Sequence, residues 1–520
     1  MQVTILSTSD VHGYFQADDF QRPNVNKHLG LSRAATVIEQ IKDQNIPDNV
    51  VITIENGDFI QGSPLTSYIT RQPFSKSGLY AKLADDVGYD VRVLGNHEFN
   101  YGRDYLERLF ENDATLLNAN IIDQVSKQLF VGQPYRIITQ NGLRIGIIGL
   151  TTDYIPHWET EDHIKNLVFL DPVETAKTYI QKLRPTVDVL ILAYHGGFAQ
   201  DLSTGKPIEL PTGENQGYQL LHLPGVDALV TGHQHRELAQ VVDGVPTTQP
   251  GYRANQIGKI DLQLDAMHQI KHGQATLIAT GDFAEQQEIV VHSRAVYTAT
   301  NQWLANPIGH VGENMKITDH FAARLHHHPF LELVNQVQMD AGNTTIANTA
   351  LFNNEMQGLP DAVTQRDIMT NYIYPNTLVV ERLSGADIKE ALEVNACYFI
   401  VEPNGKLVVN PHYLNPKVQH YNYDVWSGID YKFDFSQPMG QRLVTVMYQG
   451  QPLEDGVFYE VAMNNYRATG AGGFSSFSTQ KIVREIQVET ADLIGEYIRS
   501  HPQIKIGQPT NITSIGYTRL

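Results

Sequence analysis

The chain has 520 residues, 42% of them hydrophobic, and a formal net charge of −19. This length exceeds what one ordinary hydrophobic core serves, so we expect two or more globular domains. The negative charge argues against a nucleic-acid polymer or an anionic membrane surface as the main partner, because either would call for a basic face. Small phosphorylated ligands remain compatible with it, since a local metal centre can overcome a distant negative field.

The cysteine content limits which residues can bind a metal ion, and the first residues of the chain bear on where in the cell the protein is expected. The single cysteine, Cys397, excludes an intramolecular disulfide and any cysteine-based zinc site, which leaves His, Asp and Asn as metal ligands; we interpret Cys397 as a small core residue. No run of eighteen apolar residues occurs, so no membrane-spanning helix is expected. The first residues have neither a basic start nor an apolar segment, so we expect a cytoplasmic protein; an exported form with its signal removed is the alternative.

The first half of the chain alternates β-rich runs with helical periodicity, a pattern typical of a layered α/β domain. Paired strands over 241–264 are expected to close this domain, and the amphipathic stretch 283–304 is expected to form a long helix that links it to the second half. The other strands are expected at 2–7, 50–54, 91–94, 143–150, 187–193 and 226–230, and the helices at 31–42, 80–87 and 173–183.

Five of these β-rich runs end in polar side chains suited to chelation. One histidine at a strand end is more often a structural residue than a ligand, but loops at the ends of buried strands commonly carry function on α/β scaffolds. The loop 95–102 is the most unusual, because it sets an amide and an imidazole side by side. The residues that follow the five runs are Asp10 with His12, Asp58, Asn96 with His97, His195, and His233 with His235.

From about residue 307 onward the sequence pattern differs from that of the first half. The triplet 326–328 is all histidine, and we interpret it as a solvated surface run and not as a metal site. The stretch 345–354 is small and polar. Helices are expected at 330–340, 385–396 and 491–500, a strand at 377–382, and hairpin-like strands over 430–450.

The order of the five polar loops resembles the calcineurin-like metallophosphoesterases. The motifs are Asp-x-His, Gly-Asp, Gly-Asn-His-Glu, His-Gly and Gly-His-x-His, each after a β-rich run. The resemblance implies an α/β fold with a four-layer αββα dimetal domain over 1–282, a linker helix over 283–306 and a C-terminal α+β nucleotidase domain over 307–520 that binds the base.

The same resemblance implies two divalent metal ions, of which Zn, Mn, Fe and Co all suit imidazole and carboxylate ligands. A carboxylate shared by two ions would hold them about 3.5–4 Å apart, and a hydroxide between them would attack phosphorus. By resemblance, Asp10, His12, Asp58 and His235 hold one ion, and Asp58, Asn96, His195 and His233 hold the other.

His97 is implied to act beside the ions, either by stabilising charge on the phosphoryl oxygens or by protonating the leaving alkoxide. In many relatives an aspartate three residues further on orients this histidine, but here the residue is Asn100. An amide can accept a hydrogen bond from imidazole, yet it cannot stabilise imidazolium by charge. We therefore expect His97 to lack the charge support that an aspartate would give.

Asn100, together with the stretches 372–378, 421–424 and 464–468, resembles the 2′,3′-cyclic-nucleotide 2′-phosphodiesterase/3′-nucleotidase branch. In such enzymes two aromatic residues sandwich the base, and the matching positions are Tyr374 and Tyr466. Stacking is worth roughly 1–3 kcal/mol per base. The alternative is that both tyrosines are core residues. The stretch 348–353 lacks the arginine of the 5′-nucleotidase motif, which favours the cyclic branch.

We therefore expect an enzyme that hydrolyses 2′,3′-cyclic nucleotides and 3′-nucleotides, with its chemistry between the domains and a hinge at the linker closing the site. One alternative is a 5′-nucleotidase or nucleotide-sugar hydrolase. A remote alternative is a non-catalytic nucleotide-binding protein on the same fold. The expected partner is the nucleotide substrate, with no nucleic-acid polymer, membrane or protein partner.

Overall fold

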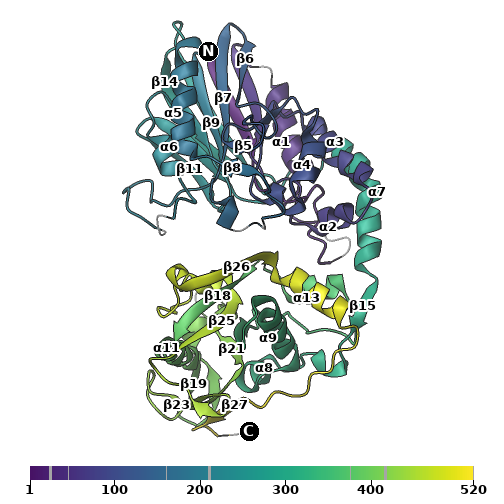
Figure 1. The fold of residues 1–520 in the computed structure, drawn as a ribbon, viewed down its shortest axis with the longest axis vertical. Helices are drawn as coiled ribbons and strands as arrows, with labels where there is room; N and C mark the ends of the chain where they lie inside the picture. Colours follow the sequence, from purple (N-terminus) through teal and green to yellow (C-terminus); the bar gives the residue numbers. More distant parts are fainter. Residues whose placement is uncertain are drawn as a thin grey trace. The chain divides into compact units, whose positions relative to one another are not determined.

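The structure is a computed structural model that describes residues 1–22, 26–44, 46–157, 159, 161–208, 212–374, 376–414 and 418–518. The chain forms two compact units, Met1–Trp303 and Leu304–Leu520 (Figure 1). Each unit has its own hydrophobic core. In the described part of the chain, no helix combines the length and apolar character needed to cross a membrane.

Two six-stranded sheets face each other in the first unit, as far as the described residues show. Their inward-facing Val, Ile and Leu side chains form one shared core, including Ile52 of the first sheet and Ile191 of the second. The first sheet runs in the order β14 (Ile270–Ala279), β13 (Gln256–Leu264), β1 (Gln2–Thr8), β2 (Asn49–Glu55), β3 (Val91–Val93) and β4 (Leu116–Leu117). The second runs β11 (Glu237–Val242), β12 (Val245–Pro250), β10 (Ala228–Val230), β9 (Val189–His195), β7 (Leu143–Thr151) and β6 (Tyr135–Gln140).

Helices cover the outer faces of both sheets and complete four layers. In Figure 1, α5 and α6 lie on one side of the unit, and α1, α3 and α4 on the other. Helix α5 begins at an Asp171 cap followed by proline, and its apolar side packs on β7 and β9. The helices of this unit are α1 (Leu31–Asp43), α2 (Pro64–Thr70), α3 (Gly78–Val87), α4 (Arg103–Phe110), α5 (Pro172–Leu183), α6 (Gly217–Leu221) and α7 (Gln287–Leu304). The short strands β5 (Ile121–Asp123) and β8 (Leu167–Phe169) pair with each other.

Parallel pairing places the strand ends that matter on one edge of each sheet. Strands β1, β2 and β3 are mutually parallel, and so are β9 and β10. The loops that follow these five strands therefore leave their sheets at the carboxyl ends.

Two expectations for the end of this unit need correction. The strands within 241–264 do not form one closing pair: β11 pairs with β12 in the second sheet, whereas β13 pairs with β1 and β14 in the first. The long helix starts at Gln287, four residues later than expected. The residues before it are held by α1, because Arg33 donates to the Gly281 carbonyl and Ser32 donates to the Glu285 carboxylate at 2.8 Å.

The second unit contains a five-stranded sheet, in the order β21 (Asp424–Ser427), β16 (Ile346–Ala350), β25 (Phe458–Asn464), β18 (Thr377–Ser384) and β26 (Ile482–Glu489), among the residues described. A four-stranded sheet has the order β24 (Gln451–Pro452), β23 (Leu443–Tyr448), β22 (Ile429–Asp434) and β27 (Ile512–Ile515). The remaining strands are β15 (Pro307–His310), β17 (Ala362–Thr364), β19 (Phe399–Val401) and β20 (Leu407–Val409). The helices are α8 (His320–His326), α9 (Pro329–Gly342), α10 (Gln365–Asn371), α11 (Gly385–Ala396), α12 (Asn465–Ala468) and α13 (Thr490–Ser500).

Two expectations for this unit also differ from the structure, and one stretch for which no element was predicted contains a strand. The stretch that looked only small and polar contains the buried strand β16, because β21 and β25 pair with it on both sides. The histidine triplet is not a solvated run: His327 is buried with its Nδ1 2.7 Å from Asn511 Oδ1, and His328 caps α9 by accepting from the Phe330 amide. Cys397 is half-buried at the end of α11 and is not a core residue.

Candidate functional site

Seven polar residues gather at the carboxyl ends of the five parallel strands. They form two groups whose ligand atoms lie within 4.8 Å of one another, one made of Asp10, His12 and His235 and the other of Asp58, His195 and His233. Asn96 lies beside the second group, with its Oδ1 3.1 Å from His195 Nε2. The order of β1, β2, β3, β9 and β10 in the two sheets thus brings together residues up to 225 positions apart, from Asp10 to His235.

The backbone at this site is strained. A positive φ is uncommon for a residue other than glycine and costs roughly 1–3 kcal/mol when a non-glycine residue is held there. Such residues persist only where the surrounding structure holds them, and they concentrate at functional sites. Five of the seven candidate ligands have a positive φ, namely Asp10 at 55°, His12 at 51°, Asp58 at 59°, His233 at 70° and His235 at 56°.

Glu98 supports the strained loop after β2. Its buried carboxylate accepts the backbone N–H groups of Asp58 at 2.9 Å, Phe59 at 2.7 Å and Gly95 at 2.6 Å, and so joins this loop to the loop after β3. Burial and then the charge of Asp58 raise the pKa of Glu98. A side chain at Gly95 would place its Cβ 2.2 Å from Asp58 Oδ1, so this close approach requires glycine.

In the first group, hydrogen bonds orient the imidazole rings toward a common point. His12 Nδ1 lies 2.8 Å from the Gln61 carbonyl and must donate to it, which leaves Nε2 as the nitrogen with the lone pair. That Nε2 lies 3.0 Å from His235 Nε2, and His235 Nε2 lies 3.5 Å from Asp10 Oδ1. The His235 ring is stacked on Tyr252 at 4.9 Å.

In the second group, hydrogen bonds likewise determine which ring nitrogen of two histidines has the lone pair. His195 Nδ1 donates to the Asn56 carbonyl at 2.6 Å, so its Nε2 lone pair faces Asn96 Oδ1 at 3.1 Å. His233 Nε2 lies 2.8 Å from the Glu214 carboxylate, so its Nδ1 lone pair faces the same Asn96 oxygen at 2.9 Å. Two imidazole lone pairs and an amide oxygen directed at one another form a donor set that a divalent cation would bind.

This donor set fits a pair of divalent metal ions. Neutral imidazole nitrogens held in place by a second hydrogen bond are the usual form of histidine metal ligands. Asp58 Oδ2 lies 3.3 Å from His195 Nε2 and 3.8 Å from His12 Nε2, so one carboxylate oxygen reaches both groups. Imidazole, carboxylate and amide ligands without thiolate suit Zn, Mn, Fe or Co, and the ligand types do not select one of them.

The pKa shifts of the buried residues also favour a site for divalent metal ions. Burial opposes ionisation of Asp58, but the charges of His195 and His97 outweigh it and hold the Asp58 pKa well below its usual range. Burial lowers the pKa of His12 to about 3, although Asp58 opposes this. Burial would lower the pKa of His195, but the charge of Asp58 overcomes it and raises this pKa to about 10, so a metal ion that binds at Nε2 must displace a proton from it. Buried carboxylates that stay ionised need nearby positive charge, which a divalent ion supplies.

His97 lies beside the first group and outside both. Its ring centroid is 5.3 Å from that of His12, and its backbone N–H donates to Asp58 Oδ1 at 2.8 Å. Its Nδ1 lies 2.7 Å from Asn100 Oδ1, so the two residues singled out in the loop 95–102 are in contact.

Comparison with known proteins places this geometry in a family. Residues 3–237 match the calcineurin-like phosphoesterases, and residues 307–479 match the 5′-nucleotidase C-terminal domain. The solved structure of a Staphylococcus aureus protein, described as a candidate 5′-nucleotidase in complex with alpha-ketoglutarate, is 33% identical with a TM-score of 0.72, over 99% of this chain and 100% of that one. The chain belongs to the calcineurin-like phosphoesterases that carry a 5′-nucleotidase C-terminal domain. The expected family and two-domain α/β fold are thus confirmed.

Two curated relatives in this family have a more specific name. The 2′,3′-cyclic-nucleotide 2′-phosphodiesterase/3′-nucleotidase of Haemophilus influenzae is 27% identical over 96% of this chain and 85% of its own length. The protein of the same name from Salmonella typhimurium is 28% identical over 90% of this chain and 82% of its own length.

Within the 5′-nucleotidase C-terminal domain, Tyr374 and Tyr466 line the same small cavity of about 220 Å³. Their exposed fractions of 38% and 47% exclude the alternative that both are core residues. Tyr421 lies between them, with its ring centroid 6.5 Å from each. The remaining lining residues are Phe352, Asn376, Asn464 and Arg467.

Sequence reasoning missed three acidic residues of the phosphoesterase site. Glu98 stood inside the recognised Gly-Asn-His-Glu motif, so its spacing was an available signal. Glu214 contacts His233, and Glu159 contacts Asn100. Neither directly follows a β-rich run, because each lies well beyond the end of its strand, so the pattern of strand ends could not find them.

Proposed function

We propose that the chain is a metal-dependent phosphoesterase that hydrolyses nucleotides, with 2′,3′-cyclic nucleotides and 3′-nucleotides as its preferred substrates. The observation that carries the proposal is the pair of histidine-carboxylate groups with Asp58 between them, where imidazole lone pairs converge on Asn96. Family membership and the name shared by the Haemophilus influenzae and Salmonella typhimurium relatives support the same reaction class.

In this proposal the residues divide into two ligand sets that share Asp58. The chemistry that two bound divalent ions supply is acidification of a water molecule and polarisation of the phosphoryl oxygens. Asp10, His12, Asp58 and His235 would hold one ion, and Asp58, Asn96, His195 and His233 the other.

His97 would serve the leaving group. With Nδ1 engaged by Asn100, the opposite ring nitrogen Nε2 is the one that can hold a proton for the substrate. For a 2′,3′-cyclic nucleotide, a water-derived oxygen forms a bond to phosphorus, and the proton lost by that water passes to solvent. The bond from phosphorus to the 2′-oxygen breaks, and the 2′-oxygen takes a proton from Nε2 of doubly protonated His97, which keeps its Nδ1 proton on Asn100. The product is a 3′-nucleotide, whose monoester is hydrolysed in a second binding event.

Tyr374 and Tyr466 would bind the base. Both are accessible aromatic rings at one cavity, and stacking on aromatic faces is worth roughly 1–3 kcal/mol per base while tolerating different bases. We infer a nucleotide substrate and not a small phosphate ester from this feature of the second unit.

The main rival is a 5′-nucleotidase, which the 33% identity to the Staphylococcus aureus protein favours. A substrate panel on protein reconstituted with Zn, Mn, Fe or Co decides between them, using 2′,3′-cyclic AMP, 3′-AMP, 5′-AMP and a small aryl phosphate. We expect the highest kcat/KM for the cyclic substrate. A higher value for 5′-AMP would establish the rival instead.

His97→Ala tests the assignment of the chemistry in the same assays. Losing a general acid costs about 100-fold to 10,000-fold in rate, whereas metal content measured by elemental analysis should stay at the wild-type level. Loss of the metal ions from this variant would contradict the proposed role. A wild-type protein that binds two ions and hydrolyses none of the four substrates would point to the non-catalytic alternative.

A further inference from the structure

Glu159 lies behind Asn100, on the side away from His97. Asn100 Nδ2 donates to Glu159 Oε2 at 2.7 Å, while Asn100 Oδ1 lies 2.7 Å from His97 Nδ1. The Glu159 side chain is only 8% exposed, so water competes little for this contact. The amide of Asn100 is thus held between an imidazole and a carboxylate.

These contacts determine which group donates and which accepts in each hydrogen bond. An ionised carboxylate can only accept hydrogen bonds, so Glu159 must face the NH₂ group of Asn100. The amide oxygen of Asn100 then faces His97, and because that oxygen can only accept, His97 Nδ1 must carry a proton. Without Glu159 the amide could turn over and present its NH₂ group to His97, which would favour the opposite tautomer of the ring.

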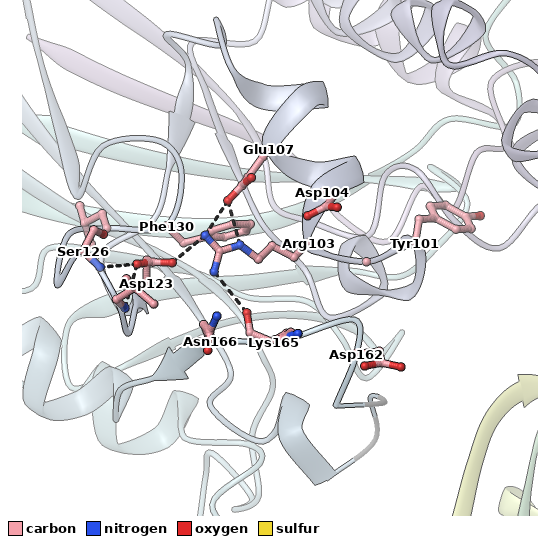
Figure 2. A pocket seen from close by; sticks show the side chains of 13 residues that line it. Tyr101, Arg103, Asp104, Glu107, Asp123, Ser126, Phe130, Asp162, Lys165 and Asn166 are labelled. Carbon is pink, nitrogen blue, oxygen red and sulfur yellow. Dashed lines mark hydrogen bonds and ion pairs between the residues drawn. The ribbon is translucent and has the colours of Figure 1, made fainter.

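Further hydrogen bonds hold the Glu159 carboxylate in place. Its second oxygen, Oε1, lies 2.8 Å from His163 Nδ1, and the His163 carbonyl accepts from the backbone N–H of Arg103 at 2.9 Å. The Arg103 side chain contacts Glu107 at 2.7 Å, Asp123 at 2.6 Å and the Lys165 carbonyl at 3.2 Å. Figure 2 shows these three contacts. Arg103 is the first residue of α4, so the segment 161–166 is tied to the helix that directly follows the loop carrying His97 and Asn100.

We propose that Glu159 is a positioning residue that acts through Asn100 to fix the tautomer and orientation of His97. The proposal rests on the proposed function, in which His97 Nε2 serves the leaving group. It also revises the expectation that Asn100 deprives His97 of a carboxylate, because a carboxylate is present one hydrogen bond further away. An aspartate at position 100 would need no such partner, since both of its oxygens accept.

Exchanging the amide and the acid tests the proposal. In Glu159→Gln, two amides face each other and no group enforces the direction, so kcat should fall about 10-fold with little change in KM. In Asn100→Asp, two carboxylates come into contact, and kcat should fall by a similar factor of about 10. In the double variant, the new amide at position 159 donates to the new carboxylate at position 100, which accepts from His97 again. The kcat of the double variant should therefore return to within about threefold of the wild type.

A purely structural role predicts a different pattern. If Glu159 only held its segment in place, the losses of the two single variants would multiply in the double variant, and this outcome would overturn the proposal. In a His97→Ala background, Glu159→Gln should cost nothing further. Glu161→Gln, which removes the same charge from an exposed position two residues away, should keep wild-type turnover.

A second measurement does not depend on activity. Zinc-loaded protein labelled with ¹⁵N-histidine reports the tautomer of each ring by NMR, and the His97 signals are identified by their absence from His97→Ala. We expect the Nδ1–H tautomer in the wild type and in the double variant, and a shift toward the other tautomer in Glu159→Gln. An unchanged tautomer in Glu159→Gln would refute this proposal. The NMR result does not depend on the substrate panel, so it tests the role of Glu159 even if the panel contradicts the proposed function.

Discussion

The backbone carbonyl of Asn56 accepts a hydrogen bond from Nδ1 of His195 at 2.6 Å. This contact joins the loop after β2 to the last residue of β9, in the opposite sheet. It also decides which nitrogen of His195 faces Asp58. The protein therefore sets the form of a candidate metal ligand through its main chain, which no side-chain substitution at position 56 would remove.

Asp58→Asn should remove most metal binding and nearly all activity. Asp58 Oδ2 reaches His195 and His12, so losing its charge weakens both proposed ion sites together. We expect metal content to fall from about two ions per chain toward none, and turnover to fall at least about 100-fold. Elemental analysis after dialysis and a rate measurement check this. Asp243→Asn, at a highly exposed turn between β11 and β12, is the control and should retain both properties.

Glu214→Gln should weaken one of the two proposed ion sites. The Glu214 carboxylate accepts from His233 Nε2 and so keeps Nδ1 available as a ligand, and replacing such a partner typically costs about 10–100-fold in metal affinity. Metal titration by calorimetry should show one weakened step and one unchanged step. Equal weakening of both steps, or of neither, would contradict the assignment of His233 to a single ion.

Tyr466→Ala should raise KM for nucleotides far more than for a small aryl phosphate. Loss of one stacking face is worth roughly 1–3 kcal/mol, which corresponds to about 5-fold to 150-fold in affinity. The aryl phosphate serves as the internal control, because it has no base to place in the cavity lined by Tyr466. Similar KM changes for both substrates would exclude base stacking at this residue.

Glu381 should make the second unit less stable as the pH rises. Burial raises the pKa of this β18 side chain to about 8 from an ordinary value of about 4.5, although the Ser478 amide and Lys481 oppose the shift. The folded chain then holds a proton that the unfolded chain has released, so stability is fully present below about pH 4.5 and is lost toward pH 8. The slope should reach at most about 1.4 kcal/mol per pH unit.

Urea unfolding from pH 5 to pH 8, followed through the fluorescence of the buried Trp426, measures this slope. Glu381→Gln should flatten it, because the amide does not titrate. Glu454→Gln, at an exposed position, is the matched control and should leave the slope as in the wild type. A wild-type unfolding free energy that does not change with pH would contradict the prediction.

The sequence by itself determined the layered fold and the seven candidate ligands. Buried strands were predicted from short apolar runs, and α11 was predicted with its observed limits. The structure shows a Ser384 cap at its start, which is a local feature of the sequence. The candidate ligands were predicted from motifs at the ends of these runs, which resemble those of a known family. Each lies at the end of a strand or within a few residues of it, and the close approach at Gly95 requires glycine in any chain that folds this way.

Only the tertiary structure decided which residues support those ligands. Glu214 lies 19 positions from His233 and Glu159 lies 59 positions from Asn100, and both are in long loops several residues beyond the end of the preceding strand. Strand β16 and the crossing of β13 to the first sheet were likewise set by their partners and not by local propensity. Hydrogen bonds between distant segments depend on where the whole chain brings them, so spacing along the sequence carries no record of them.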